Sequence, residues 1–120
     1  MTIKIAVGGC RDYNDFDFIC KSLDEYLSNY ESDDTIIILS GHCSGVDSAA
    51  EQYASLKGFE TIIFPAEWKK YGRAAGPVRN KQMVESSDIV IAFWDEKSKG
   101  TKSLINLAKK AGKTLIVYKI

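Results

Sequence analysis

Glycines, small polar side chains and basic residues recur together in short segments that each precede an amphipathic stretch. The segments read GGCRD from residue 8, SGHCSGVD from residue 40 and SKGT from residue 98. Glycine lets the backbone approach a ligand closely, and the N–H groups at the start of a helix attract anions. This combination predicts a phosphate-binding site. Its candidate residues are Gly8, Gly9, Arg11, Gly41, Gly45, Asp47, Ser98, Gly100 and Thr101.

A fourth segment, AAGPVRNKQMVES from residue 74, adds a further cation. Gly76 and Pro77 predict the end of a loop and the start of a helix, because proline is well tolerated at the first helical position. Arg79 would then lie in the first helical turn, where the helix dipole disfavours a positive charge. We therefore expect an anion beside Arg79, with further contacts from Gly76 and Asn80.

The elements that would position these segments follow from hydrophobic periodicity. Five β-branched runs predict strands over residues 3–7, 35–39, 60–64, 88–93 and 114–118. Apolar residues at spacings of three and four predict helices over residues 16–30, 46–57, 77–86 and 101–111. This alternation predicts one α/β domain over residues 1–120, a Rossmann-like three-layer sandwich with a central parallel five-stranded sheet. Ligands bind such sheets outside the carboxyl ends of the strands, which is where all four segments would lie.

The charge of the chain limits its partners. Sixteen basic and sixteen acidic residues give a formal net charge of zero, which argues against a generic electrostatic grip on nucleic acid or membrane. The first 60 residues carry eleven acids and four bases, whereas the remainder carry five acids and twelve bases. No apolar run has the length of a membrane span, and the N-terminus lacks the layout of a secretory signal. These features predict a cytoplasmic protein with no membrane partner.

The cysteines and the single histidine give little sign of catalysis. Cys10, Cys20 and Cys43 show no C-x-x-C spacing, and their odd number argues against a disulfide framework. His42 lies next to Cys43, and Cys10 could approach them, but with so few ligands an incidental cluster is favoured and no metal is predicted. The P-loop and G-x-G-x-x-G signatures are both absent, so neither a P-loop nucleotidase nor an ordinary dinucleotide oxidoreductase is supported.

Taken together, these segments resemble the YspA/YpsA-related branch of the SLOG superfamily, which also contains the LOG phosphoribohydrolases, the DprA/Smf DNA-processing proteins and the molybdenum-cofactor carriers. The resemblance covers nearly the whole chain and is most specific in A-G-P-x-R-N-x-x-M, from residue 75, and S-K-G-T. It implies a Rossmann-like fold whose glycine-rich loops bind nucleotides or nucleotide-derived ligands. Related proteins associate through helices, so a homodimer is plausible.

The same resemblance bears on catalysis. In the LOG enzymes, which cleave the N-glycosidic bond of nucleoside 5′-monophosphates, the motifs R-K-x-x-M and P-G-G-x-G-T-x-x-E carry ligand contact and catalysis. Arg79 matches the arginine of the first motif, and Gly100 and Thr101 match the middle of the second. Leu104 stands where the second motif has its glutamate. The resemblance therefore implies ligand binding more strongly than hydrolysis.

We therefore expect a sensor or carrier of a phosphorylated, nucleotide-derived ligand, with no other cofactor. Arg11 and Asn80 would complete the polar contacts, Asp47 would bond a sugar hydroxyl or orient its loop, and Trp94 or Trp68 would stack on a base or cover the sheet edge.

Two other functions stay open. The first is hydrolysis of an N-glycosidic or phosphoester bond in a small nucleotide, with Asp47 as the carboxylate that an oxocarbenium-like transition state needs. The second is single-stranded nucleic acid binding of the DprA type, which the basic second half favours and the zero net charge opposes.

Overall fold

A computed structural model describes all 120 residues of the chain. Its five strands form one parallel sheet in the order β3-β2-β1-β4-β5. The strands are β1 (Thr2–Gly9), β2 (Thr35–Ser40), β3 (Glu60–Ile63), β4 (Ile89–Trp94) and β5 (Thr114–Lys119). The predicted α/β, Rossmann-like architecture is confirmed.

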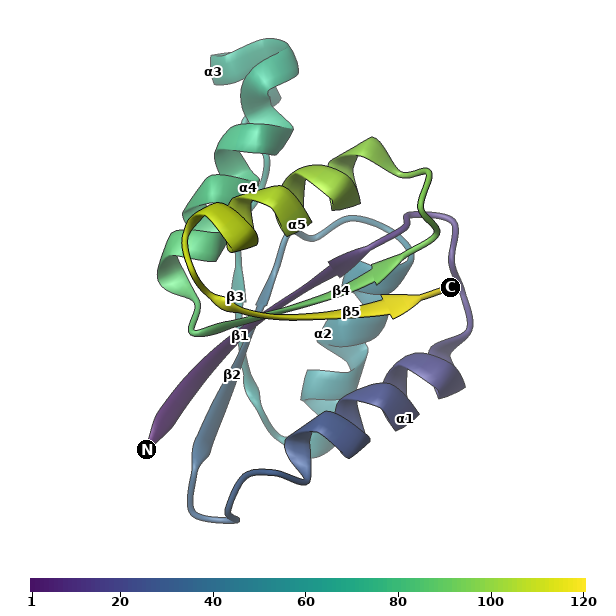
Figure 1. Cartoon of the computed structure of the whole chain (residues 1–120), viewed down its shortest axis with the longest axis vertical. Coiled ribbons are helices and arrows are strands. Elements are labelled where there is room, and N and C mark those ends of the chain that lie inside the picture. The colour runs from purple at the N-terminus through teal and green to yellow at the C-terminus, as the bar shows by residue number, and fades with distance from the viewer.

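Helices cover both faces of this sheet (Figure 1). They are α1 (Phe16–Leu27), α2 (Val46–Lys57), α3 (Trp68–Tyr71), the 3-10 turn η1 (Gly72–Ala74), α4 (Ala75–Ser86) and α5 (Lys99–Lys110). Helices α1 and α2 pack on one face, and α4 and α5 pack on the other. The short α3 projects beyond the sandwich, above the start of α4 in Figure 1. None of the helices combines the length and the apolar character that a membrane crossing requires.

Two apolar clusters hold the three layers together. Alternate strand residues point to opposite faces, so Ile5 joins the cluster under α1 and α2, whereas Ala6 joins the cluster under α4 and α5. The first cluster also contains Leu23, Ile38, Val46 and Phe93, and the second contains Leu39, Met83, Val90 and Leu104. Because helices cover both faces of the sheet, the strands are apolar on both faces. Burial of each large apolar side chain stabilises the fold by about 1.5–3 kcal/mol.

The topology places a crevice beside β1. The chain runs outward from β1 through β2 to β3, and then returns to β4, which pairs with β1 on its other side. The strand order therefore reverses between β1 and β4. Open α/β sheets bind ligands outside the carboxyl ends of the strands at such a reversal.

The two glycines after the first predicted strand belong to the strand itself. Strand β1 runs two residues further than predicted because Gly8 and Gly9 pair in register with Ala92 and Phe93 of β4. A Cβ on Gly9 would lie 2.5 Å from the carbonyl oxygen of Phe93, and one on Gly8 would lie 2.7 Å from Cδ2 of Leu104. Close packing of neighbouring elements therefore requires glycine at both positions.

Two helix ends differ from the prediction because of local hydrogen bonds. Helix α1 ends at Leu27 instead of residue 30, since the side chains of Ser28 and Asn29 donate to carbonyl oxygens of the last turn at 2.6 and 2.8 Å. Helix α5 begins at Lys99 instead of residue 101. Ser98 is its N-cap, and Oγ of Ser98 accepts a hydrogen bond from the backbone N–H of Thr101 at 3.3 Å.

The segment before α4 is helical, although a loop was predicted. Because α3 and η1 lead directly into α4 at Ala75, Pro77 is the third helical residue and not the first. The third position also tolerates proline, since the first four N–H groups of a helix have no intrahelical partner. Arg79 is consequently the fifth residue of α4 and lies beyond the first turn. The helix dipole is therefore not the reason to expect an anion beside it.

Candidate ligand-binding site

A cavity of about 600 Å³ lies at the carboxyl ends of the strands, beside the reversal between β1 and β4. The structure brings all but two of the predicted ligand-binding residues into its wall. These are Gly8, Gly9, Arg11, Gly41, Asp47, Gly76, Arg79, Asn80, Ser98, Gly100 and Thr101. Four segments that are far apart in the sequence therefore form one continuous surface.

The two predicted residues outside the wall are Gly45 and Trp94. Gly45 has a φ of 73°, and a Cβ there would collide with the carbonyl oxygens of Cys10 and Arg11. It is a structural glycine, which lets the loop after β2 pack against the loop after β1.

The two tryptophans have different surroundings. The indole N–H of Trp94 donates to the carbonyl oxygen of Ser98 at 3.1 Å, so this side chain braces the loop before α5. Trp68 lines the cavity and is 54% exposed. Of the two, Trp68 is therefore the one that can stack on a ligand.

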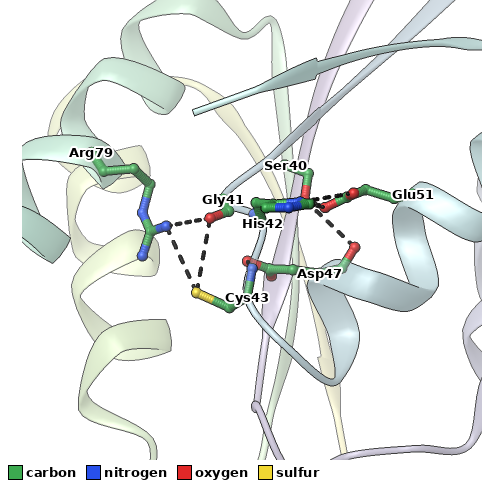
Figure 2. A network of polar contacts seen from close by, with 7 residues as sticks. All are labelled: Ser40, Gly41, His42, Cys43, Asp47, Glu51 and Arg79. Carbon is green, nitrogen blue, oxygen red and sulfur yellow. Dashed lines mark hydrogen bonds and ion pairs between the residues drawn. The ribbon is translucent and has the colours of Figure 1, made fainter. Parts of the chain in front are cut away.

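Arg79 is a buried cation in the cavity wall, with only 7% of its surface exposed. Its Nη1 donates to the carbonyl oxygen of Gly41 at 2.7 Å (Figure 2). Its Nε donates to Oδ1 of Asn80 at 2.9 Å. None of the five ion pairs of the protein includes it. Every buried side-chain nitrogen or oxygen atom has a hydrogen-bond partner, so Nη2, which bonds no protein atom, must open to the cavity. The guanidinium is held in place and presents an unpaired edge.

Asn80 connects this arginine to the next helix. Its Oδ1 accepts from Arg79, and its Nδ2 donates to the carbonyl oxygen of Gly100 at 3.2 Å. The position of the guanidinium is thereby coupled to the first turn of α5.

Helix α5 presents its N-terminus at the cavity wall. The hydroxyl of Ser98 accepts a hydrogen bond from the backbone N–H of Thr101. The carbonyl oxygen of Ser98 accepts one from the backbone N–H of Lys102. The N–H groups of Lys99 and Gly100 precede the first residue that can bond within the helix. Such free N–H groups favour an anion.

Asp47 is a buried carboxyl group on the opposite side of Gly41 from Arg79. It is 6% exposed, and its Oδ2 accepts a hydrogen bond from the backbone N–H of Cys43 at 3.3 Å. Burial raises its pKa to about 6, although that hydrogen bond and the charge of Arg79 act in the opposite direction. The N-cap of α2 is Gly45, so Asp47 does not cap the helix.

Cations outnumber acids in the cavity wall. The cations are Arg11, Arg73, Arg79, Lys97 and Lys99, and the acids are Asp12, Asp47 and Asp95. Oδ1 of Asp95 accepts from the backbone N–H groups of Ser98 and Lys97, each at 2.8 Å, and these hydrogen bonds lower its pKa. Although the chain as a whole is neutral, the wall therefore suits an anionic ligand.

Ser40, His42 and Glu51 form a polar network beside the cavity (Figure 2). Glu51 accepts from Oγ of Ser40 at 2.7 Å and lies 3.0 Å from Nδ1 of His42. In a nucleophilic triad the histidine lies between the hydroxyl and the acid. Here the acid, Glu51, lies between the Ser40 hydroxyl and the His42 ring. Ser40 is also fully buried, so the network fixes the loop after β2 and supplies no nucleophile. The sequence prediction missed Glu51, although it lies one helical turn after Asp47 on α2.

The cysteines remain free thiols, and two of them line the cavity. Burial, with a contribution from Asp95, raises the pKa of Cys10. Sγ of Cys43 lies 3.8 Å from Nη1 of Arg79. No group of three or more histidine, cysteine or acidic residues is arranged to hold a metal ion.

Leu104 forms an apolar part of the cavity wall. It is 3% exposed and packs against Gly8 of β1. This is the position at which the LOG motif has its glutamate, so the wall is apolar where those enzymes carry a carboxylate.

Known proteins share both the sequence pattern and the fold. Residues 3–71 match the model of the YspA, cpYpsA-related SLOG family. The Gene 61 protein of Mycobacterium phage D29 is 28% identical over 121 residues, which cover 96% of this chain and 95% of that protein.

Two solved structures of DNA processing protein A have a similar fold. The protein from Streptococcus pneumoniae superposes with a TM-score of 0.75 at 20% identity, over 97% of this chain and 50% of that one. The protein from Helicobacter pylori, whose structure concerns its single-stranded DNA binding mode, superposes with a TM-score of 0.72 at 22% identity, over 96% of this chain and 64% of that one. This chain thus spans half of the Streptococcus pneumoniae protein and slightly less than two thirds of the Helicobacter pylori protein.

Proposed function

The chain belongs to the YspA, cpYpsA-related SLOG family, and on that basis we propose that it binds a nucleotide or a nucleotide-derived phosphorylated ligand in the strand-end cavity, as a sensor or carrier. Arg79 carries this proposal. A buried cation without a carboxylate partner is unfavourable unless an anion meets it, and the free edge of this guanidinium opens to the cavity. Phosphate oxygens match the planar donor geometry of arginine.

The remaining wall residues have roles that fit such a ligand. The free N–H groups of Lys99 and Gly100, and the close backbone at Gly8, Gly9 and Gly76, suit phosphate oxygens. Arg11 and Thr101 add polar contacts, and Asp47 accepts a hydrogen bond from a sugar hydroxyl. Trp68 supplies an aromatic surface for the base.

We propose binding without turnover because the wall is poor in catalytic groups. Leu104 replaces the glutamate of the LOG motif, and Asp95 is already held by the backbone of its own loop. Asp47 is the one buried carboxyl group in the wall, and its Oδ2 already accepts a hydrogen bond from the backbone N–H of Cys43.

A ligand screen tests the proposal. Native mass spectrometry of the freshly purified protein would reveal a retained ligand. Thermal unfolding would then be followed with the four ribonucleoside 5′-monophosphates and with inorganic phosphate. We expect at least one nucleotide to stabilise the wild type, by about 2.7 kcal/mol at a concentration 100 times its Kd. If no phosphorylated compound shifts the unfolding temperature, the proposal fails.

Asp47 supports a second candidate function, hydrolysis of an N-glycosidic or phosphoester bond. A carboxyl group with a pKa of about 6 suits general acid catalysis near neutral pH. Release of base or phosphate from the ligand, followed by chromatography, distinguishes this function from binding. Turnover that Asp47→Asn abolishes without loss of affinity would establish the enzyme, and absent turnover in the wild type would exclude it.

A third candidate is single-stranded nucleic acid binding, as described for the DNA processing protein A of Helicobacter pylori. The α3 and η1 segment carries two aromatic and three basic residues close together: Trp68, Lys69, Lys70, Tyr71 and Arg73. Aromatic stacking with backbone neutralisation is how single strands are held. Oligonucleotide affinity that falls steeply with salt would favour this function, and oligonucleotide affinity below that of a mononucleotide would argue against it.

A further inference from the structure

A second hollow, of about 310 Å³, adjoins the strand-end cavity. The two share five wall residues, namely Arg11, Gly41, Cys43, Trp68 and Arg79. His42, Ser44, Pro65 and Ala66 line only the second hollow. Each volume falls in the range of roughly 300–1,000 Å³ that holds a small ligand, so each hollow can take one part of a longer molecule.

From this arrangement we propose that the natural ligand is a dinucleotide, with a diphosphate at the junction and one nucleoside in each hollow. This inference rests on the proposed function, which requires only one nucleotide moiety. It adds a second nucleoside subsite between the loop after β2 and the loop after β3.

The junction has the charge that a diphosphate requires. Arg11 and Arg79 line both hollows, one from the loop after β1 and the other from α4. No acidic residue lines the second hollow. Arg11 is held close to that hollow because its carbonyl oxygen accepts a hydrogen bond from Oγ of Ser44 at 3.2 Å. Two guanidinium groups at one junction suit two linked phosphates better than a single phosphate.

The wall of the second hollow suits a planar base. Pro65 and Ala66 are apolar, and Trp68 contributes an exposed indole. The ring of His42 also lies in this wall, with 64% of its side chain exposed. Its Nδ1 is tied to Glu51, so the ring is held in one orientation while Nε2 bonds no protein atom. Aromatic and heteroaromatic rings of this kind stack on bases.

The backbone at His42 supports a role for its side chain. His42 has a φ of 61°, in the left-handed region that L-residues other than glycine rarely adopt. A glycine would hold this turn with less strain. This strained turn places the His42 ring in the wall of the second hollow. A loop that only connects two elements would have no need for a strained, ring-bearing residue at this position.

The first hollow differs in a way that assigns the two ends of the ligand. It contains the carboxyl groups of Asp12 and Asp47, which can accept hydrogen bonds from ribose hydroxyls. The second hollow contains none. The nucleoside of the first hollow is therefore recognised through its sugar as well as its base, and the nucleoside of the second hollow is recognised through its base alone.

Paired ligands test this inference. For each of the four bases, the nucleoside 5′-monophosphate and the symmetrical dinucleoside 5′,5′-diphosphate would be titrated calorimetrically into the wild type, Ala66→Glu and Glu67→Ala. Ala66→Glu places a carboxylate in the second hollow alone, and Glu67→Ala changes the next residue, which lines neither hollow. Unfolding temperatures would show that each variant is folded.

We expect at least one dinucleotide to bind the wild type about 10-fold or more tightly than its mononucleotide, in keeping with one additional stacked base. Ala66→Glu should remove this gain and leave mononucleotide affinity within about two-fold, and Glu67→Ala should change neither. Equal binding of the two members of every pair would overturn the inference and leave the proposed function intact. A gain that persists in folded Ala66→Glu would also overturn it, and a complete absence of binding would overturn both.

Discussion

Arg79 and Asp47 approach each other across Gly41, without forming an ion pair. A Cβ on Gly41 would lie 2.5 Å from Nη1 of Arg79 and 3.0 Å from Oδ2 of Asp47. The arginine comes from α4 and the aspartate from α2, on opposite faces of the sheet. The end of β2 is therefore the place where charged groups of two layers meet, and this place lies in the wall of the cavity.

Gly41→Ala should displace the guanidinium and reduce both stability and ligand binding. Overpacking of this kind typically costs about 1–3 kcal/mol. The measurement is thermal unfolding with and without the nucleotide that stabilises the wild type. Gly100→Ala is the matched control for stability, because nothing lies within 4 Å of a Cβ at that position. Equal unfolding temperatures for the two variants would contradict the packing described here.

Asp47→Asn should stabilise the protein near neutral pH. The pKa of Asp47 is raised from 3.8 to about 6, so the folded state favours the protonated carboxyl. The stabilisation that the protonated Asp47 carboxyl provides is complete below pH 3.8 and is lost as the pH rises through about 6. The difference between these two pKa values corresponds to about 3 kcal/mol, at 1.36 kcal/mol per pKa unit. Denaturant unfolding at pH 4 and pH 7.5 should show the gain for Asp47→Asn at pH 7.5 and little at pH 4.

Asp95→Asn provides a comparison of opposite sign. The pKa of Asp95 is lowered by hydrogen bonds from the backbone of Ser98 and Lys97. Its contribution to stability is therefore present above its unfolded pKa and is lost as the pH falls through the folded value. Asp95→Asn should destabilise the protein at neutral pH. If both variants shift stability in the same direction, the electrostatic description of the cavity is wrong.

Much of the fold could be predicted from the sequence because its signals are local. The apolar runs around Ile5, Ile38 and Val90 are continuous, as strands covered on both faces require. Parallel strands then bring all the following loops to one edge, so the position of the site followed from topology. The start of α4 could not be predicted in this way, because no side-chain cap marks it and the break in the helical backbone falls earlier, at Gly72, whose φ is 55°.

The roles of individual site residues were less predictable because they depend on contacts between distant segments. Arg79 bonds to Gly41, 38 residues earlier, and Asn80 bonds to Gly100, 20 residues later. The use of the Trp94 indole as a brace depends on the path of the loop to Ser98. Residue types and spacings predicted most of the residues that line the cavity, whereas the hydrogen-bond partners of those residues required the structure.

Ser98→Ala should loosen the start of α5. Removal of a serine N-cap costs about 1 kcal/mol, and Oγ of Ser98 also lies 3.0 Å from Oγ1 of Thr101. Since this turn forms part of the cavity wall, ligand affinity should fall as well. Ser103→Ala, within the same helix and the same wall, is the control. Chemical denaturation should show the loss in Ser98→Ala alone, and an equal effect in both variants would argue against the capping role.

The most direct measurement is calorimetric titration of the stabilising nucleotide into the wild type, Arg79→Ala, Arg79→Lys and Lys81→Ala. Lys81 is the matched control, because it is a cation on the exposed side of the same helix, 3.9 Å from Glu85. Hydrogen bonds to a charged group contribute about 1.5–3 kcal/mol, so Arg79→Ala should weaken binding roughly 10- to 150-fold. Arg79→Lys should recover part of that loss, and Lys81→Ala should bind as the wild type does. Unchanged affinity in a folded Arg79→Ala protein would contradict the assignment of this cavity as the phosphate site.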